Sequence, residues 1–282
     1  MISLFPKAIL IITVLTIVSY LIICVGLLLF QNRLIFFPSK TIEKTPDLLG
    51  MLYQEVWLKL PDSTSESEQI NGWWIPGDSD IVILDLHGNS SNIGGNLGYA
   101  KQFHHLGFSV FLIDYRGYGC SSDRFPCEQR VYEDAELAFN YLVNSRNIPP
   151  DKIVVFGHSL GGAIAIELAT KHPQIAGLII ESSFTSILDM VKVKKQYRIF
   201  PINWLLHQRF DSLAKVRELK MPILFTHGTA DELVTASMSE QLYQACPEPK
   251  QLLMIPDADH NHVKEMGGDR YRETIKKFVE SL

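Results

Sequence analysis

The chain has 282 residues, of which 46% are hydrophobic and 20% charged, and it contains four cysteines. This composition is too apolar for a disordered chain and too poor in cysteine for a disulfide-held scaffold. The formal net charge is −5. We interpret the one short basic stretch, Lys192 to Arg198, as a solvated face, and therefore expect no nucleic-acid partner.

An uncharged apolar run occupies Ala8–Phe30 near the amino terminus. As a helix it would span roughly 35 Å at about 1.5 Å per residue, against about 30 Å of bilayer hydrocarbon. The run is longer than the apolar region of a signal peptide, and no small-residue cleavage site follows it. The sequence therefore predicts a single-pass anchor in residues 1–33, with the membrane bilayer as its partner, and one further domain over residues 34–282.

The charges that flank this run bear on its orientation. The amino terminus and Lys7 precede it, and Arg33, Lys40 and Lys44 follow it. Positive charge collects on the cytoplasmic side of membrane segments. The difference is one charge, which favours a cytoplasmic location for the domain without settling the side.

The domain begins with two runs that are rich in strand-forming residues. Arg33–Gly50 is interpreted as a linker or docking segment. Tyr53–Leu60 and Gln69–Ile75 follow, separated by the polar turn Ser63–Gln69. Two such runs joined by a short polar connection predict an antiparallel pair of strands.

Short apolar runs then alternate with helical patterns, which predicts an α/β fold with a mostly parallel sheet and helices on both faces. With the opening pair, the sheet has eight predicted strands. The six later strands are Ile81–Leu86, Phe108–Ile113, Lys152–Phe156, Ala176–Ile180, Pro222–Phe225 and Gln251–Ile255, and the helices are Asn92–Leu106, Val131–Ser145, Ser159–Lys171, Val234–Ala245 and Arg270–Ser281.

One stretch interrupts this alternation. Phe184–Lys220 separates two predicted strands by more residues than a crossover helix requires, and it mixes basic with aromatic side chains. We interpret it as a minimal helical lid over the carboxyl edge of the sheet. The alternative is a longer but ordinary crossover connection.

The segment Gly157–Gly161 fits the pattern G-x-S-x-G and lies directly between a predicted strand and a predicted helix. In that context a sharp turn presents the serine at the carboxyl end of the strand. Ser159 is therefore the candidate nucleophile. The backbone N–H of Leu160, at the start of the helix, is the first candidate donor to an oxyanion.

A serine hydroxyl needs a base to take its proton and an acid to orient that base. Asp231 and His260 each follow a predicted strand, in the chain order Ser–Asp–His that this architecture uses. Glu232 is the alternative acid and His262 the alternative base.

A second oxyanion donor is expected after the strand Ile81–Leu86, where His87, Gly88 and Asn89 follow. The candidate is the backbone N–H of Asn89, whereas His87 is interpreted as a structural histidine. The segment Asp114–Gly119 follows the next strand and is expected to shape the pocket wall without a catalytic role.

Together these segments resemble the α/β-hydrolase superfamily over about Leu34 to Leu282. The resemblance rests on HGNSSN, DYRGYGCSS, GHSLGG, HGTADELV and ADHNH, in this order. With the anchor and the junction NRLIFFPS, the chain resembles a membrane-anchored subgroup that includes the bud-emergence-type proteins and the eukaryotic depalmitoylating hydrolases. The resemblance implies Ser159 as nucleophile, Asp231 as acid, His260 as base, and a minimal lid.

The chain departs from this subgroup near the base. Asp259 stands before His260 where the subgroup often has glycine, and His262 stands where it often has aspartate. This departure keeps His262 open as an alternative base.

We expect a membrane-anchored serine hydrolase that cleaves an ester or thioester through an acyl-enzyme. This chemistry needs no cofactor or metal, and the substrate is expected to be a small molecule, a lipid or an acylated protein. A serine peptidase on the same triad and a non-catalytic binding protein on the same fold are the alternatives. The sequence gives no indication of oligomeric state.

Overall fold

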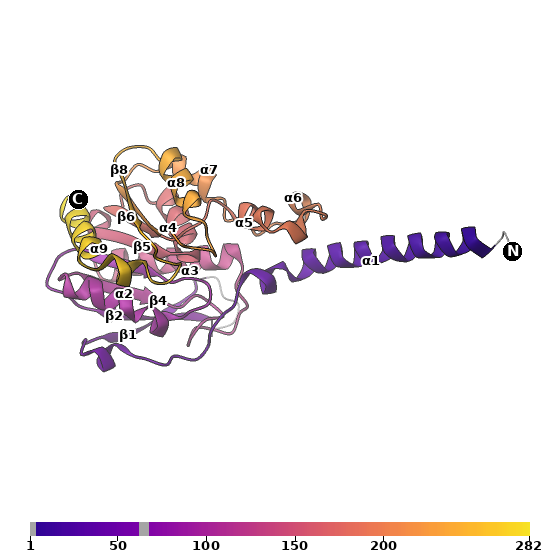
Figure 1. Ribbon diagram of the computed structural model, residues 1–282. Helices are drawn as coiled ribbons and strands as arrows, with labels where there is room; N and C mark the ends of the chain where they lie inside the picture. Colours follow the sequence, from indigo (N-terminus) through magenta and orange to yellow (C-terminus); the bar gives the residue numbers. More distant parts are fainter. Residues whose placement is uncertain (1–3, 62–67) are drawn as a thin grey trace.

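The computed structural model describes residues 4–61 and 68–282, so most of the predicted polar turn Ser63–Gln69 lies outside the described residues. A long amino-terminal helix, α1 (Leu4–Ile35), projects from one end of an α/β domain (Figure 1). The domain is built around one eight-stranded sheet.

The strands of this sheet lie in the order β1-β2-β4-β3-β5-β6-β7-β8. β1 and β2 are antiparallel, β2 is antiparallel to β4, and all other neighbours are parallel. The predicted mostly parallel sheet with an antiparallel opening pair is therefore confirmed. The strands are β1 (Gln54–Lys59), β2 (Gln69–Ile75), β3 (Val82–Leu86), β4 (Ser109–Ile113), β5 (Ile153–His158), β6 (Gly177–Glu181), β7 (Ile223–Gly228) and β8 (Lys250–Ile255).

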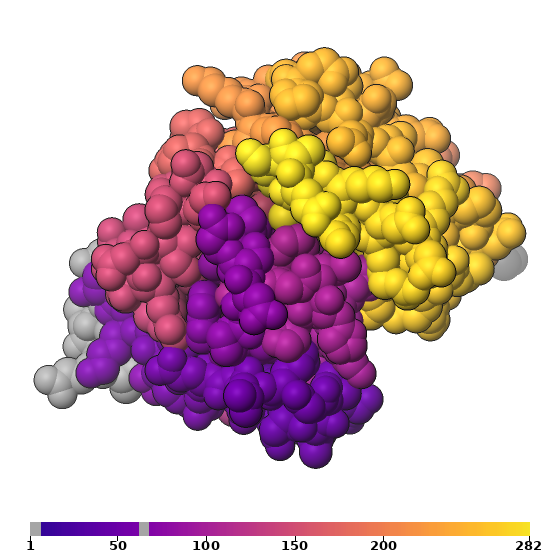
Figure 2. Space-filling view, turned by 90° about the vertical axis from the view of Figure 1, so that its left-hand side faces the viewer, coloured from indigo at the N-terminus to yellow at the C-terminus, as the bar shows by residue number. Residues whose placement is uncertain are grey.

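Helices cover both faces of the sheet, because successive side chains of each buried strand point to opposite faces. In β3, Ile83 packs in the hydrophobic cluster under α2 (Ile93–His105) and α9 (Val263–Glu280), and Leu84 packs in the cluster under α3, α4 and α8. Figure 2 shows the face away from α1, with α9 in yellow across its upper part. The remaining main helices are α3 (Glu128–Asn140), α4 (Leu160–Lys171) and α8 (Ala236–Ala245).

Two helix boundaries differ from the predicted ones. α9 begins at Val263 and not at Arg270, because Gly268 adopts φ 49° and joins two helical pieces across a kink. The helix predicted over Val131–Ser145 begins at Glu128 and ends in a π-helical turn over Tyr141–Ser145. The kink accounts for the longer α9, whereas α3 begins three residues earlier than predicted and its π-helical turn lies within the predicted range.

The amino-terminal helix is longer than its apolar run. α1 continues through Gln31 and Arg33 to Ile35, and most apolar side chains of the Ala8–Phe30 run are exposed. By length and composition, it is the one helix in the described part of the chain that could cross a membrane. Immediately after it, Phe36 is buried in the core of the domain.

The insertion Phe184–Lys220 forms short helices in place of one crossover helix. α5 (Ile187–Val193) and α6 (Ile202–Leu205) project from the domain alongside α1, and α7 (Ser212–Lys215) packs on α4 (Figure 1). Single turns of 3-10 helix lie at Pro46–Leu49, Pro150–Lys152, Lys195–Tyr197 and Val216–Glu218.

The close approach of α4 to the sheet generates a first prediction. A Cβ atom at Gly161 would lie 1.9 Å from the carbonyl oxygen of Leu86. We expect Gly161→Ala to lower the free energy of unfolding by about 3 kcal/mol, the upper end of overpacking costs. Thermal unfolding of the full chain in detergent measures this change.

Gly98→Ala is the matched control, because its Cβ would meet only the flexible end of the Lys264 side chain. In helix α2 this control should be neutral or stabilising by up to about 1 kcal/mol. Equal melting temperatures for the two variants would contradict the packing argument.

Candidate active site

The turn between β5 and α4 holds Ser159 in a strained conformation. Its backbone has φ 55° and ψ −115°, a region that residues with a side chain rarely adopt. The turn is tight enough that a Cβ atom at Gly157 would lie 2.3 Å from the carbonyl oxygen of Gly161. This geometry lifts the Ser159 side chain to the carboxyl edge of the sheet.

Three sequence-predicted residues meet at this edge. Ser159 Oγ lies 3.0 Å from His260 Nε2, and His260 Nδ1 lies 2.7 Å from Asp231 Oδ2. Because the Asp231 carboxylate accepts, Nδ1 carries the ring proton and the Nε2 lone pair faces the serine hydroxyl. All three side chains are buried. The structure brings together the three residues that the sequence singled out from loops after β5, β7 and β8.

The environment of Asp231 keeps this carboxyl ionised. Burial disfavours its charged form, but hydrogen bonds from His227 and His260 and from the backbone outweigh burial, so the pKa of Asp231 lies well below its usual value. Its second oxygen accepts from the backbone N–H groups of Leu233 and Val234, at 2.9 and 2.8 Å. A fixed anion therefore faces His260.

His227 is a partner of Asp231 that the sequence did not single out. Its Nε2 lies 3.0 Å from Asp231 Oδ2 and 2.9 Å from the carbonyl oxygen of Val234, so this nitrogen carries the proton. Its Nδ1 accepts from the hydroxyl of Ser239 at 2.6 Å. These bonds fix the loop after β7, and with it the position of Asp231.

His158, next to the serine, supports the loop that carries the base. Its Nε2 donates to the carbonyl oxygen of His260 at 3.0 Å, and its ring lies between those of Tyr99 and His260. Burial, followed by the charge of His260, lowers the pKa of His158 to about 4. His158 is therefore neutral at physiological pH and positions its neighbour without exchanging a proton.

The two rival residues point elsewhere. Glu232 is exposed. His262 is also exposed, and its Nδ1 lies 2.7 Å from Asp259 Oδ1. Asp259 also accepts from the backbone N–H groups of Asn261 and His262, so it caps the start of the loop that leads into α9. The structure thus places His260, and not His262, against Ser159.

The two expected oxyanion donors both lie beside Ser159. Leu160 opens helix α4, so its N–H has no carbonyl partner within the helix. Asn89 lies in the turn that follows β3. Both residues line the same cavity as Ser159.

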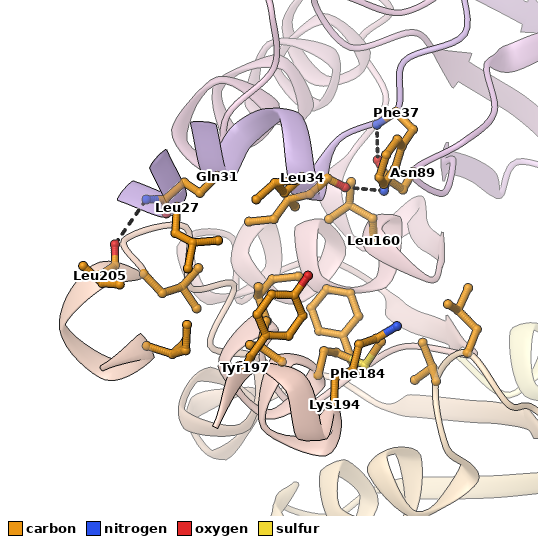
Figure 3. A pocket seen from close by; sticks show the side chains of 18 of the residues that line it. Leu27, Gln31, Leu34, Phe37, Asn89, Leu160, Phe184, Lys194, Tyr197 and Leu205 are labelled. Atoms are coloured by element: carbon orange, nitrogen blue, oxygen red, sulfur yellow. Dashed lines mark hydrogen bonds between the residues drawn. The ribbon is translucent and has the colours of Figure 1, made fainter. Parts of the chain in front are cut away.

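The Asn89 side chain has a role that the sequence did not indicate. Its Oδ1 accepts from the backbone N–H of Phe37 at 3.1 Å and from the hydroxyl of Tyr118 at 2.9 Å, and its Nδ2 donates to the carbonyl oxygen of Ile35. Asn89 therefore ties the end of α1 to the turn that follows β3 (Figure 3). The segment Asp114–Gly119 was expected to shape the pocket wall, but it does not line the cavity. It contacts the lining through the Tyr118 hydroxyl, which donates to Asn89 Oδ1.

A cavity of about 380 Å³ extends from Ser159. Figure 3 shows it between the carboxyl-terminal end of α1 and the short helices of the insertion. α1 and the residues after it contribute Leu27, Gln31, Leu34, Ile35 and Phe37. The opposite wall is mainly apolar, and its lining includes Phe184, Ile187, Met190, Val191, Tyr197, Ile202, Leu205 and Leu206.

Within the described residues, no group of three or more His, Cys, Asp or Glu side chains is arranged to hold a metal ion. A hydroxyl aligned with a histidine and a buried carboxylate can attack an acyl carbon.

The sheet order and the strand–turn–helix at Ser159 define the chain as an α/β hydrolase. A family model described as serine aminopeptidase, S33, matches residues 77–215, and one described as PhoPQ-activated pathogenicity-related protein matches residues 186–282. An esterase from Pyrococcus furiosus has the same fold, with a TM-score of 0.72 and 20% identity over 87% of this chain and 98% of its own. An α/β hydrolase from Vibrio vulnificus has a TM-score of 0.72 and 24% identity over 88% of this chain and 92% of its own.

Relatives match almost the whole chain. Protein bem46 of Schizosaccharomyces pombe is 32% identical over 89% of this chain and 86% of its own length. The α/β-hydrolase domain-containing protein WAV2 of Arabidopsis thaliana is 30% identical over 90% of this chain and 89% of its own length. The chain therefore belongs to the α/β-hydrolase family, in the subgroup of the bud-emergence-type proteins.

The hydrogen bonds of Asn89 generate a second prediction. Asn89→Ala keeps the backbone N–H but removes the bonds to Ile35, Phe37 and Tyr118. We expect the free energy of unfolding to fall by about 1–3 kcal/mol, because three hydrogen bonds are lost and one of the partners, Tyr118, is buried. Thermal unfolding measures the loss, and Ser90→Ala at the exposed neighbouring position is the control. Equal stability of the two variants would show that this contact contributes nothing.

Proposed function

We propose that this protein is a serine hydrolase that cleaves a carboxylic ester or thioester through an acyl-enzyme. The observation that carries the proposal is the line of hydrogen bonds from Ser159 through His260 to an ionised Asp231, opening onto an apolar cavity. His260 takes the serine proton as the hydroxyl attacks the acyl carbon. It then returns the proton to the leaving group, and a water molecule repeats the sequence to release the acid.

The oxyanion that forms on the acyl group is held by the backbone N–H groups of Leu160 and Asn89. Both residues face the cavity beside Ser159, and the Leu160 amide also lies at the positive end of α4. Removing one such donor typically costs about 10²–10³ in kcat. The mainly apolar lining favours a substrate with a hydrocarbon acyl group over a polar peptide.

Cleavage of a peptide is the second candidate, because the family model that matches residues 77–215 is described as a serine aminopeptidase. Asp189 lies in the first turn of α5, and its carboxylate accepts from the hydroxyls of Thr185 and Ser186. It is therefore already bonded within its own turn and is not free to hold the amino group of a peptide. Comparing the hydrolysis of matched ester, thioester and amide substrates separates the two functions.

Active-site labelling tests the proposed triad. We expect a fluorophosphonate probe to label the full chain in membranes, and Ser159→Ala and His260→Ala to abolish labelling. Asp231→Asn should lower kcat for ester hydrolysis roughly 10³–10⁴-fold, because it removes the anion that orients the base. His262→Ala is the matched histidine control and should label like the wild type. Labelling that survives in His260→Ala and disappears in His262→Ala would reverse the assignment of the base, and a folded wild type that never labels would refute the enzyme function.

We also propose that α1 is a retained membrane anchor. Its side chains at Leu27, Gln31 and Leu34 line the cavity, and Gln31 is buried against the insertion. Loss of α1 would leave the cavity without one wall. The exposed apolar surface of the rest of the helix supports the same proposal, because water disfavours a surface of this extent.

Epitope tags at the two ends of the chain test this proposal. We expect both tags on one full-length band that stays in the membrane pellet after alkaline carbonate extraction. A processed band that has lost the amino-terminal tag, released into the supernatant, would show that α1 is a cleaved signal. A form that starts at Arg33 is the soluble control.

A further inference from the structure

Residues 187–207, which include α5 and α6, project beyond the body of the domain and are called the lid arm below. Figure 1 shows this segment alongside the carboxyl-terminal half of α1. The lid arm is attached to the domain at its two ends, so the part between them contacts mainly α1 and the cavity.

The lid arm is bonded to α1 at two levels. At the far level, the Tyr20 hydroxyl donates to the carbonyl oxygen of Ile199 at 2.9 Å, and the Tyr20 ring stacks on Phe200 with 5.5 Å between ring centroids. At the near level, Gln31 Nε2 donates to the carbonyl oxygen of Leu205 at 3.2 Å, and its Oε1 accepts from the His207 amide at 2.9 Å.

These contacts fix the depth of the lid arm relative to the anchor. Tyr20 lies in the middle of the apolar run Ala8–Phe30, and Gln31 lies just after it. Eleven helical residues separate the two, which is about 16 Å along the axis and roughly half of a bilayer's hydrocarbon thickness. If α1 spans a bilayer, the tip of the lid arm enters the same leaflet.

The side chains of the lid arm suit this location. Val193, Ile199 and Trp204 are 60%, 70% and 88% exposed, although each is apolar. Trp is favoured at the boundary between acyl chains and headgroups. The carbonyl oxygens of Ile199 and of Leu205, the last residue of α6, have donors on α1, as lipid requires of any backbone that enters it.

The charges of the lid arm also match a lipid surface. Its basic residues outnumber its single acidic residue, Asp189, whose carboxylate accepts from the hydroxyls of Thr185 and Ser186. Basic side chains on the part of the lid arm nearer the domain can extend toward lipid phosphates while their aliphatic parts remain in the apolar layer, whereas Arg198 adjoins Ile199 at the far level and does not contribute to this argument. The basic residues are Lys192, Lys194, Lys195 and Arg198.

We propose that the lid arm is a second membrane-inserted element, which lies with the end of α1 in one leaflet and opens the cavity to the acyl chains of bilayer phospholipids. The cavity walls are these two elements, so an acyl chain passes between them from the leaflet to Ser159 without crossing water. The insertion of the lid arm rests on the proposed membrane anchor, and the acyl-chain part of the proposal rests also on the proposed hydrolase activity.

Fluorescence quenching by lipid tests the insertion directly. The full chain is reconstituted in vesicles of phosphatidylcholine and phosphatidylglycerol, with bromine on the acyl chains in one preparation. Trp204→Phe gives the emission of Trp204 by difference, and Trp57→Phe gives that of an exposed tryptophan on β1, at the far edge of the sheet. We expect brominated lipid to quench the Trp204 emission at least twofold and to leave the Trp57 emission unchanged.

Quenching of Trp204 by aqueous iodide, with no quenching by brominated lipid, would overturn the proposal. Both tryptophans are surface residues outside the core clusters, so we expect their replacement by Phe to leave the fold intact. The measurement needs no turnover, so it decides the insertion whether or not the protein is an esterase.

Ile199→Glu tests the consequence for catalysis. A charge at this exposed position opposes insertion but does not touch the cavity. We expect hydrolysis of a long-chain ester in the bilayer to fall at least tenfold, while hydrolysis of a soluble short-chain ester is unchanged. An equal effect on the two esters, or no effect on either, would refute access from the leaflet. Absence of hydrolysis of either ester by the wild type would refute the proposed function alone.

Discussion

The strained backbone at Ser159 is the constraint on which the site depends. A positive φ at a residue with a side chain costs about 1–3 kcal/mol and persists only where the surroundings over-determine it. Here the Ser159 amide donates to the carbonyl oxygen of Glu181 at 2.8 Å, and the Ser183 hydroxyl donates to the Ser159 carbonyl oxygen at 2.8 Å. The end of β6 and the residues just after it therefore hold both sides of the turn, and these hydrogen bonds maintain the strained backbone.

The other members of the site follow from the order of the strands. β7 and β8 lie next to each other beyond β6, so the loops that follow them must lean back over the sheet edge to reach Ser159. Histidines restrain both loops, since His227 bonds to Asp231 and His158 bonds to the backbone of His260. Neither histidine needs a charge for these hydrogen bonds, and neither occupies His260 Nε2, which faces Ser159 Oγ.

Much of this arrangement could be predicted from the sequence, because its signals are local. Strand periodicity located the sheet, and G-x-S-x-G after a strand located the turn. What could not be predicted are contacts between side chains and distant backbone. Gln31 bonds to residues more than 170 positions away, and Asn89 bonds to the end of α1 through atoms that its backbone role does not involve. Hydrophobic periodicity carries no information about such long-range pairs. The predicted start of α9 was wrong for a different reason. Gly267 and Gly268 resemble a helix boundary, but in the structure they form a kink within the helix.

The junction between α1 and the domain behaves as part of the fold and not as a flexible linker. Phe36 is buried, the Gly119 amide donates to the carbonyl oxygen of Ser39 at 2.8 Å, and Asn92 Nδ2 donates to the carbonyl oxygen of Thr41 at 2.7 Å. This segment was interpreted as a linker or docking segment, and the structure shows a docked one. The helix and the cavity it lines therefore keep one orientation relative to each other.

The proposed entry of the acyl chain from the lipid phase limits how the cavity can select substrates. For an acyl chain that enters from the lipid phase, transfer into an apolar cavity releases little hydrophobic free energy, because the chain leaves surroundings as apolar as those it enters. Chain length then contributes little to binding. Discrimination then falls to the polar groups that meet the ester and its leaving group, and the cavity lining includes the polar side chains of Lys194 and Gln196. Under the proposed function, the membrane would supply the apolar part of the substrate at high local concentration, and these polar side chains would select among the head groups.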